Sequence, residues 1–169
     1  YLLSDVFKKM DIKVSGSATL DYFSSYIWRG QVLDRDGVIQ PGFSMTFNDL
    51  TVGYWGNWDV VNGDTLNSDE SDYYVALNHT FMNLITAGVG HTWYGFPGTL
   101  TSSKEICATL GVLTYLNPVF TYAHDYEDGK DLNSLGHGDY YSLALSYSLP
   151  LKDKYGSSLE FATTGGYVD

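Results

Sequence analysis

A strict alternation of apolar and polar residues over positions 12–28 constrains the fold of this chain more than any other feature. Eight of the nine even-numbered residues there are apolar, aromatic or glycine, and seven of the nine odd-numbered residues from 13 to 29 are polar. Successive side chains of a β-strand point to opposite faces, whereas a helix cannot sort residues in this way. The segment therefore predicts one long β-strand with two chemically different faces.

The same two-residue period returns along the rest of the chain. Eight further segments show it, at residues 43–47, 50–58, 73–81, 85–93, 106–112, 120–122, 141–149 and 159–167. We therefore expect an all-β fold with about nine strands.

The connections between these strands alternate in length. Short turns are predicted at Asn48-Asp49, at Met82-Asn83, and at residues 115–117 and 150–156. Longer, acidic connections are predicted at residues 30–37, 61–72, 95–104 and 127–139. Short turns on one side and long loops on the other are typical of outer-membrane β-barrels. We therefore expect residues 12–169 to form an antiparallel up-and-down transmembrane β-barrel, with its first strand running outward.

The polar faces of the predicted strands indicate which side of the sheet meets water. They carry Ser, Thr, Gly, Ala and Asn, with few of the Lys and Glu residues that solvent-exposed sheets display. Charged residues make up 17% of the chain, against roughly 25% in soluble domains. Small polar residues suit a confined interior, so the apolar face is expected to meet lipid. The alternative is a soluble barrel or sandwich with an aromatic core.

Aromatic residues make up 16% of the chain and fall in two bands along the predicted strands. The band near the long loops is represented by Tyr26, Trp28, Trp58, Trp93, Tyr126 and Tyr141. Phe47, Phe81 and Tyr147 lie nearer the short turns. Two such bands are typical of the aromatic girdles at the two membrane interfaces. The prediction is a protein of the bacterial outer membrane, in contact with outer-membrane lipid and lipopolysaccharide.

Nine strands pose a problem of closure, because bacterial single-chain barrels have an even number and lipid does not tolerate an open sheet edge. We expect the intact barrel to have 10 or 12 strands. This chain would then lack at least one C-terminal strand, or a partner protein would cover the edge. Residues 1–11 have the spacing of a short amphipathic helix, a second place where a partner could bind. A frayed terminus is the alternative.

The opening hairpins contain SATLDYFSSYIWRG at residues 17–30, followed by the downstream strands GFSMTF and NDLTVGYWGNWDV. These segments resemble the TorF-like family of outer-membrane porins, and the resemblance extends over residues 15–95. The family's N-terminal strand ends in an aromatic-x-Arg-Gly element, which Trp28-Arg29-Gly30 resembles without the intervening residue. Its Gly-x-Trp-Gly-type strand is matched around Tyr54-Trp55-Gly56-Asn57, where Gly53 supplies the first glycine. The resemblance implies an outer-membrane barrel that forms a pore.

Several charged residues fall on the predicted interior face and are candidates for controlling which solutes pass. They are Lys13, Asp21, Arg29, Asp59 and Glu160. Opposite charges that line a lumen create a transverse field that selects among solutes. In a narrow barrel, however, buried charges pair with one another and plug the lumen. Arg29, next to Gly30 at the mouth, is the residue we expect to matter most for selectivity.

Other residue types give no support for catalysis or for a cofactor. The four histidines lack metal-ligand spacing, and the acidic loops are better explained as solvated charge than as calcium sites. His124 and Asp125 are adjacent on a strand and point to opposite faces, so they do not belong to one hydrolase site. Cys107 is expected to face inward as a packing thiol. A net charge of -11 argues against binding to nucleic acid.

These observations favour a porin that passes small solutes by passive diffusion, rather than an enzyme. The main alternative is a structural or scaffold barrel of the outer membrane that docks partner proteins through its loops, its N-terminal segment or an exposed edge. A lipid-modifying barrel enzyme is a third hypothesis, although no nucleophile motif supports it.

Overall fold

A computed structural model describes residues 11–60, 69–97, 101–126, 138–151 and 157–169. Nine strands form one antiparallel sheet in the order β1-β4-β5-β6-β7-β8-β9-β10-β11. Their bounds are β1 Val14–Phe23, β4 Val38–Phe47, β5 Leu50–Asp59, β6 Glu70–Phe81, β7 Ile85–Phe96, β8 Thr101–Val112, β9 Val119–Asp125, β10 Gly138–Pro150 and β11 Ser158–Val168. The predicted all-β, up-and-down arrangement of nine strands is confirmed. The predicted helix over residues 1–11 lies almost wholly outside the described residues.

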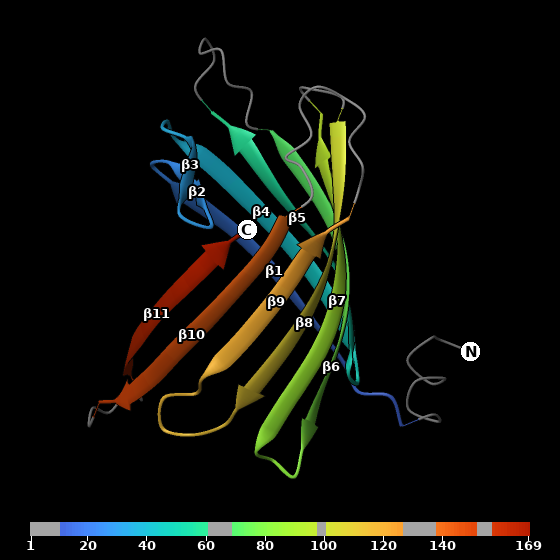
Figure 1. The fold of residues 1–169 in the computed structure, drawn as a ribbon, viewed down its shortest axis with the longest axis vertical. Coiled ribbons are helices and arrows are strands. Elements are labelled where there is room, and N and C mark those ends of the chain that lie inside the picture. The colour runs from blue at the N-terminus through green and yellow to red at the C-terminus, as the bar shows by residue number, and fades with distance from the viewer. Residues whose placement is uncertain (1–10, 61–68, 98–100, 127–137, 152–156) are drawn as a thin grey trace.

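The sheet is strongly twisted, and the described strands leave two of its edges unpaired. Each strand pairs with its neighbour in the order given, and within the described part of the chain β1 and β11 are the outermost strands and do not pair with each other. Figure 1 shows β10 and β11 passing in front of β1 in that view. The described strands therefore form the predicted meander and do not close into a barrel.

Two of the predicted tight turns are confirmed, each by its backbone geometry. Asn48, between β4 and β5, has a φ of 55°. Met82 and Asn83, between β6 and β7, have φ angles of 50° and 53°. A type I′ turn requires two successive positive φ angles, and its twist matches that of the strands it joins. These turns fix the register in which adjacent strands pair.

The predicted continuous strand over residues 12–28 is wrong at its C-terminal end. Strand β1 ends at Phe23, and the chain then leaves the sheet to form a separate hairpin of β2 (Tyr26–Trp28) and β3 (Gln31–Asp34). At the tip of this hairpin Arg29 and Gly30 have φ angles of 49° and 81°, again a type I′ turn. Periodicity missed the break because β2 is itself a strand and keeps the period of β1 across Ser24 and Ser25.

The β2–β3 hairpin identifies the inner face of the sheet. Its side chains contact Trp55 on β5, Glu70 on β6, Tyr94 on β7, Glu105 on β8 and Tyr140 on β10. A single small hairpin reaches five strands at once only from the concave side of a curved sheet. We call the face that carries these five residues the inner face, and the opposite one the outer face.

The two faces have opposite chemistry and opposite burial. On β8 the inner residues Ser103 and Glu105 are buried, whereas the outer residues Ile106 and Leu110 are 50% and 54% exposed. The same contrast recurs on β5, β6 and β7, where Val52, Leu77 and Val89 are exposed on the outer face. A sheet in water normally buries its apolar face and exposes its polar face, whereas this sheet exposes its apolar face and buries polar residues on the other.

Glycine and tyrosine, both abundant in this chain, are paired across strands on the inner face. The Tyr74 ring lies over Gly53 on the adjacent strand, and the Tyr140 ring lies over Gly166. A Cβ atom at Gly53 would overlap the Tyr74 ring, whereas a Cβ atom at Gly165 would meet nothing within 4 Å. The missing side chains therefore make room for aromatic rings inside the curved sheet.

These glycines give a first testable prediction. Gly53→Ala is expected to destabilise the fold by about 1–3 kcal/mol, because the added methyl group forces the Tyr74 ring to move. Gly165→Ala, the matched control in β11, is expected to change stability little. Urea unfolding of the detergent-solubilised protein measures both effects. Equal unfolding free energies for the two variants would contradict the proposed close packing.

Candidate functional site

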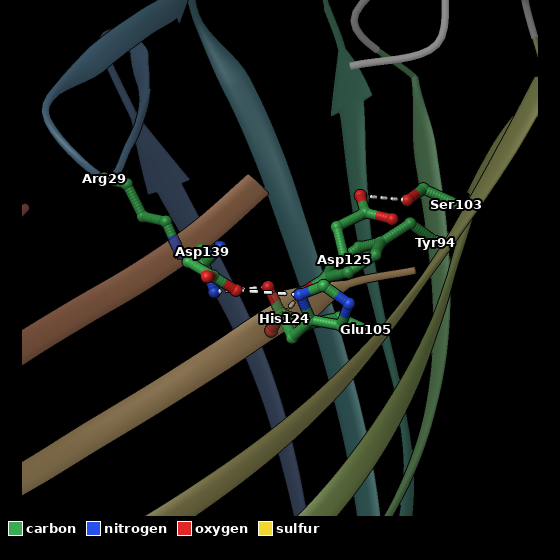
Figure 2. Close-up of polar contacts among 7 residues, drawn as sticks. All are labelled: Arg29, Tyr94, Ser103, Glu105, His124, Asp125 and Asp139. Carbon is green, nitrogen blue, oxygen red and sulfur yellow. Dashed lines mark hydrogen bonds and ion pairs between the residues drawn. The ribbon is translucent and has the colours of Figure 1, made fainter. Parts of the chain in front are cut away.

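Arg29 at the tip of the β2–β3 hairpin connects the hairpin to the inner face. Its Nη2 atom lies 2.6 Å from Glu105 Oε2, and its side chain is 16% exposed. The guanidinium carbon lies 4.3 Å from the centre of the Trp28 ring and 4.1 Å from that of Tyr140. Arg29 therefore combines an ion pair to β8 with stacking against β10. Figure 2 shows Arg29 extending from the hairpin toward the sheet.

Glu105, the partner of Arg29, receives a second contact from the neighbouring strand. The Tyr94 hydroxyl donates a hydrogen bond to Glu105 Oε1 at 3.1 Å. Both carboxylate oxygens of this buried residue are thereby satisfied, one by a cation and one by a neutral donor. A charge this buried is stable only with such partners.

Tyr26 forms a second anchor between the hairpin and the sheet. It is only 5% exposed, and its hydroxyl donates a 2.8 Å hydrogen bond to Glu70 Oε2 on β6. Its ring packs against Trp55, with 5.7 Å between ring centres. Burial, and then the nearby Glu70 carboxylate, raise the pKa of Tyr26 well above its ordinary value. The hydroxyl therefore remains a proton donor to Glu70 at all physiological pH values.

The hairpin leaves hollow space beside it on the inner face. One cavity of about 600 Å³ lies between residues 23–28 and the inner residues of β4 to β7. A second cavity, of about 140 Å³, is lined by Arg29, Glu70, Ser103, Asp125 and Tyr140 among others. The wall of the second cavity carries the carboxyl groups of Glu70, Asp125 and Asp139, and the wall of the first carries that of Asp72, so the interior around the hairpin is acidic.

The strand register places three of the five predicted lumen residues, Asp21, Asp59 and Glu160, on the inner face of the sheet, and Arg29 reaches that face from the hairpin. Asp21 is exposed on β1, in register with Gln40 of β4. Asp59 ends β5, and its backbone N–H donates to Asp69. Lys13 and Glu160 lie toward the short-turn end of the sheet. The backbone N–H of Lys13 donates a hydrogen bond to Asn48, and Glu160 on β11 accepts hydrogen bonds from the hydroxyls of Ser148 and Ser158. Arg29 alone of the five enters the hairpin contacts described above.

Two of the predicted girdle residues are placed elsewhere. Tyr26 and Trp28 belong to β2, and both line the 600 Å³ cavity on the inner side of the sheet. The reason is that the chain leaves the nine-stranded sheet after β1, so Tyr26 and Trp28 are not part of that sheet. The remaining four, Trp58, Trp93, Tyr126 and Tyr141, are exposed at the long-loop end of the sheet. Their contact with lipid stays a prediction.

The sequence missed the acidic residues that hold the hairpin. Glu70 and Asp72 fell within the predicted loop at 61–72, yet β6 begins at Glu70. Glu70, Asp72 and Tyr74 keep the two-residue period of that strand, and Glu105 and Cys107 do so on β8. Extending each strand by this period would have found them. Cys107 lies on the inner face beside Gly90, as predicted.

The predicted separation of His124 and Asp125 is confirmed. His124 Nδ1 lies 2.7 Å from Asp139 Oδ1, whereas Asp125 accepts a hydrogen bond from Ser103 on the inner face. Figure 2 shows the two pairs as separate contacts. His79 pairs with Asp49 at 2.8 Å, and His137 lies outside the described residues. Within the described ranges no group of three or more histidine, cysteine or acidic side chains is arranged to hold a metal ion.

Comparison with known proteins finds no family model, no curated protein and no solved structure that matches this chain. The resemblance to TorF-like porins therefore stays a prediction. No helix in the described ranges is long and apolar enough to cross a membrane.

Proposed function

We propose that this chain forms the wall of a porin of the bacterial outer membrane, through which small solutes diffuse passively. The observation that carries this proposal is the reversed sheet, with an exposed apolar outer face and buried charged residues on the inner face. Contiguous exposed apolar surface on a stable protein marks contact with a membrane or a partner. A tilted antiparallel sheet with a lipid-facing apolar side is the architecture of outer-membrane barrels.

The β2–β3 hairpin would narrow the path through such a barrel. It lies against the inner face and is anchored at Glu70 and Glu105. Rings of acidic side chains at a constriction favour cations over anions. The buried acidic residues Glu70, Asp72 and Glu105, with Arg29 paired to one of them, would therefore make the path cation-preferring. Such transport needs neither a cofactor nor a catalytic residue.

A second function, a scaffold barrel that docks partner proteins, is favoured by the free edges of the sheet. All eleven residues of β11 are exposed, and its outer edge carries no paired strand within the described part of the chain. An unpaired edge is a template on which a strand of a partner can add by backbone hydrogen bonds. This function would use the edge and not the interior.

Planar-bilayer recording tests the porin proposal. The chain, refolded in detergent and checked for heat-modifiable mobility on gels, is expected to produce stepwise currents. In a salt gradient the reversal potential is expected to show a preference for potassium over chloride, because the interior is acidic. A folded protein that inserts but conducts nothing would overturn the pore and favour the scaffold. A protein fully soluble without detergent would overturn the membrane location as well.

A further inference from the structure

The two outermost strands of the sheet run in the same direction. Nine strands follow one another, and each is antiparallel to its neighbour. Because the number is odd, β1 and β11 both run from the short-turn end to the long-loop end. They cannot form an antiparallel pair with each other, whereas one strand that runs the opposite way can pair antiparallel with both.

Alternate residues of β1 present their backbone groups to its unpaired edge. In an antiparallel pair each residue directs its N–H and C=O groups to one side, and successive residues direct them to opposite sides. The N–H of Asn48 donates to the C=O of Lys13 at 2.9 Å, so the odd-numbered residues face β4. The residues that face the unpaired edge carry their side chains on the outer face. They are Val14, Gly16, Ala18, Leu20 and Tyr22.

Strand β11 presents the opposite set of residues to its own unpaired edge. The N–H of Asp169 donates to the C=O of Asp139 at 2.9 Å, so the odd-numbered residues of β11 face β10. The even-numbered residues face the edge, and their side chains lie on the inner face, where Tyr140 covers Gly166. They are Ser158, Glu160, Ala162, Thr164, Gly166 and Val168.

A single added strand satisfies both edges without conflict. Its residues with outer side chains direct their backbone groups to β1, whose edge residues also point outward. Its residues with inner side chains direct theirs to β11, whose edge residues point inward. Because this division is the natural alternation of one antiparallel strand, the two edges are complementary to one strand placed between them. The faces of the sheet continue through it if its outer side chains are apolar and its inner ones are small and polar.

The exposure and charge of the edge strands specify this added strand further. Every residue of β1 and of β11 is exposed, on the inner face as well as the outer one. The inner side chains there include the carboxylate of Asp21, which forms no ion pair with any described residue. Asp21 directs its backbone to β4, so it would form a non-hydrogen-bonded pair with the added strand, in which side chains lie closest. Opposite charges at such a position stabilise the pair, which favours a basic residue opposite Asp21.

We propose that the edges of β1 and β11 together bind one extended segment of a partner protein, antiparallel to both strands. The segment has apolar side chains on the outer face, small polar side chains on the inner face and a basic residue opposite Asp21. Addition of a strand to an exposed sheet edge is a general mode of peptide recognition. This inference rests on the proposed function in one respect, since the added strand would complete the wall of the barrel.

A synthetic peptide as long as the 11 residues of β11 is a direct probe. Leucine and threonine alternate along it, with arginine in place of the first threonine, and fluorescence anisotropy measures its binding to the full chain in detergent. N-methylation of the leucines removes the donors that face β1, and N-methylation of the threonines removes those that face β11. Each change is expected to weaken binding at least about tenfold, because several hydrogen bonds are lost.

These peptides test the bridging of the two edges on the unmodified protein. Sensitivity to only one of the two methylation patterns would mean that the peptide adds to one edge, which overturns the proposal. The absence of binding, or binding that tolerates both patterns, would also overturn it. A dimer in detergent that excludes the peptide would make a second copy of this chain the occupant, with the same consequence.

Proline at the two edges locates the bound strand. Ala18→Pro and Thr164→Pro each remove an N–H that faces an unpaired edge, a position at which a strand tolerates proline. Each is expected to weaken peptide binding at least about tenfold while heat-modifiable mobility is kept. Ala18→Val and Thr164→Val keep the N–H and are the matched controls, with unchanged binding. Undiminished binding to both proline variants would overturn the assignment to these edges.

The charge of Asp21 is tested with a second peptide, in which glutamate replaces the arginine. It is expected to bind about threefold more weakly, within the range of an exposed ion pair. Asp21→Asn is expected to remove the difference between the two peptides. A difference that persists in Asp21→Asn would overturn the predicted register of the added strand.

The failure of this proposal differs from the failure of the porin. The peptide is expected to raise the fraction of insertions that give stable stepwise currents, because it completes the wall. Stepwise currents from a chain that does not bind the peptide would overturn this inference and leave the porin intact. Binding through both edges, in a protein that conducts nothing with or without the peptide, would support this inference and overturn the porin.

Discussion

Arg29→Met is expected to release the β2–β3 hairpin from the inner face and to increase the conductance of the channel. Methionine keeps much of the length of the side chain but removes the ion pair to Glu105 and the stacking on Tyr140. Removing one partner of a buried ion pair costs about 3–5 kcal/mol, because the remaining charge is left without compensation. The hairpin then has Tyr26 as its remaining described anchor on β6.

Two controls separate the charge of Arg29 from its shape. Arg29→Lys keeps the charge and loses the planar group that stacks between Trp28 and Tyr140, so an intermediate loss of stability is expected. Glu105→Gln in the Arg29→Met background removes the stranded charge and is expected to recover part of the loss. A double-mutant cycle on urea unfolding measures the coupling between the two residues. A coupling near zero would contradict the ion pair as an anchor.

The same variant is expected to change which ions pass. Arg29 is the positive group among the buried carboxylates Glu70, Asp72 and Glu105. Its removal makes the constriction more negative, so the preference for cations over anions rises. Reversal potentials in a salt gradient measure this preference. Selectivity that stays the same, with a hairpin that is still in place, would exclude Arg29 from the path of the ions.

The strand count followed from the sequence because each strand separates an apolar face from a polar one. Neighbouring strands repeat the alternation of apolar and polar residues, and tight turns such as Met82-Asn83 mark the places where the chain reverses direction. Closure could not be predicted in this way, because alternation describes a strand and its faces but not the curvature of the sheet. The β2–β3 hairpin could not be predicted for a related reason, since Tyr26 and Trp28 continue the two-residue period of β1 after the chain has left the sheet.

The candidate site could be predicted only in part. Arg29 was identifiable because a charged residue followed by glycine stood at the end of a predicted strand. The period of β8 places Glu105 on the inner face, but its pairing with Arg29 could not be predicted, because that contact forms between a hairpin tip and a distant strand. Asp72 depends on the same arrangement, since it becomes part of a cavity only when the hairpin covers the sheet. Sequence periodicity gives the face of a residue, while long-range packing decides what that face meets.

Leu143→Arg is expected to prevent stable insertion of the protein into a bilayer. Leu143 lies near the middle of β10 on the outer face and is 50% exposed. An arginine on the lipid-facing side of a barrel costs about 2–4 kcal/mol at the bilayer midplane. Urea-dependent folding into lipid vesicles, followed by tryptophan fluorescence or heat-modifiable mobility, measures that cost.

Ser142→Arg is the matched control, because Ser142 is adjacent on the same strand and points to the inner face, in register with Thr121 and Gly166. An arginine there faces a polar interior, so folding into vesicles is expected to be affected far less than in Leu143→Arg. If the protein is instead a soluble sheet, its apolar outer face is covered by protein and not by lipid. Arginine at Leu143 would then disrupt that covering contact in water, and lipid would make no difference. The dependence of the Leu143→Arg defect on lipid therefore decides which apolar phase the outer face was built to meet.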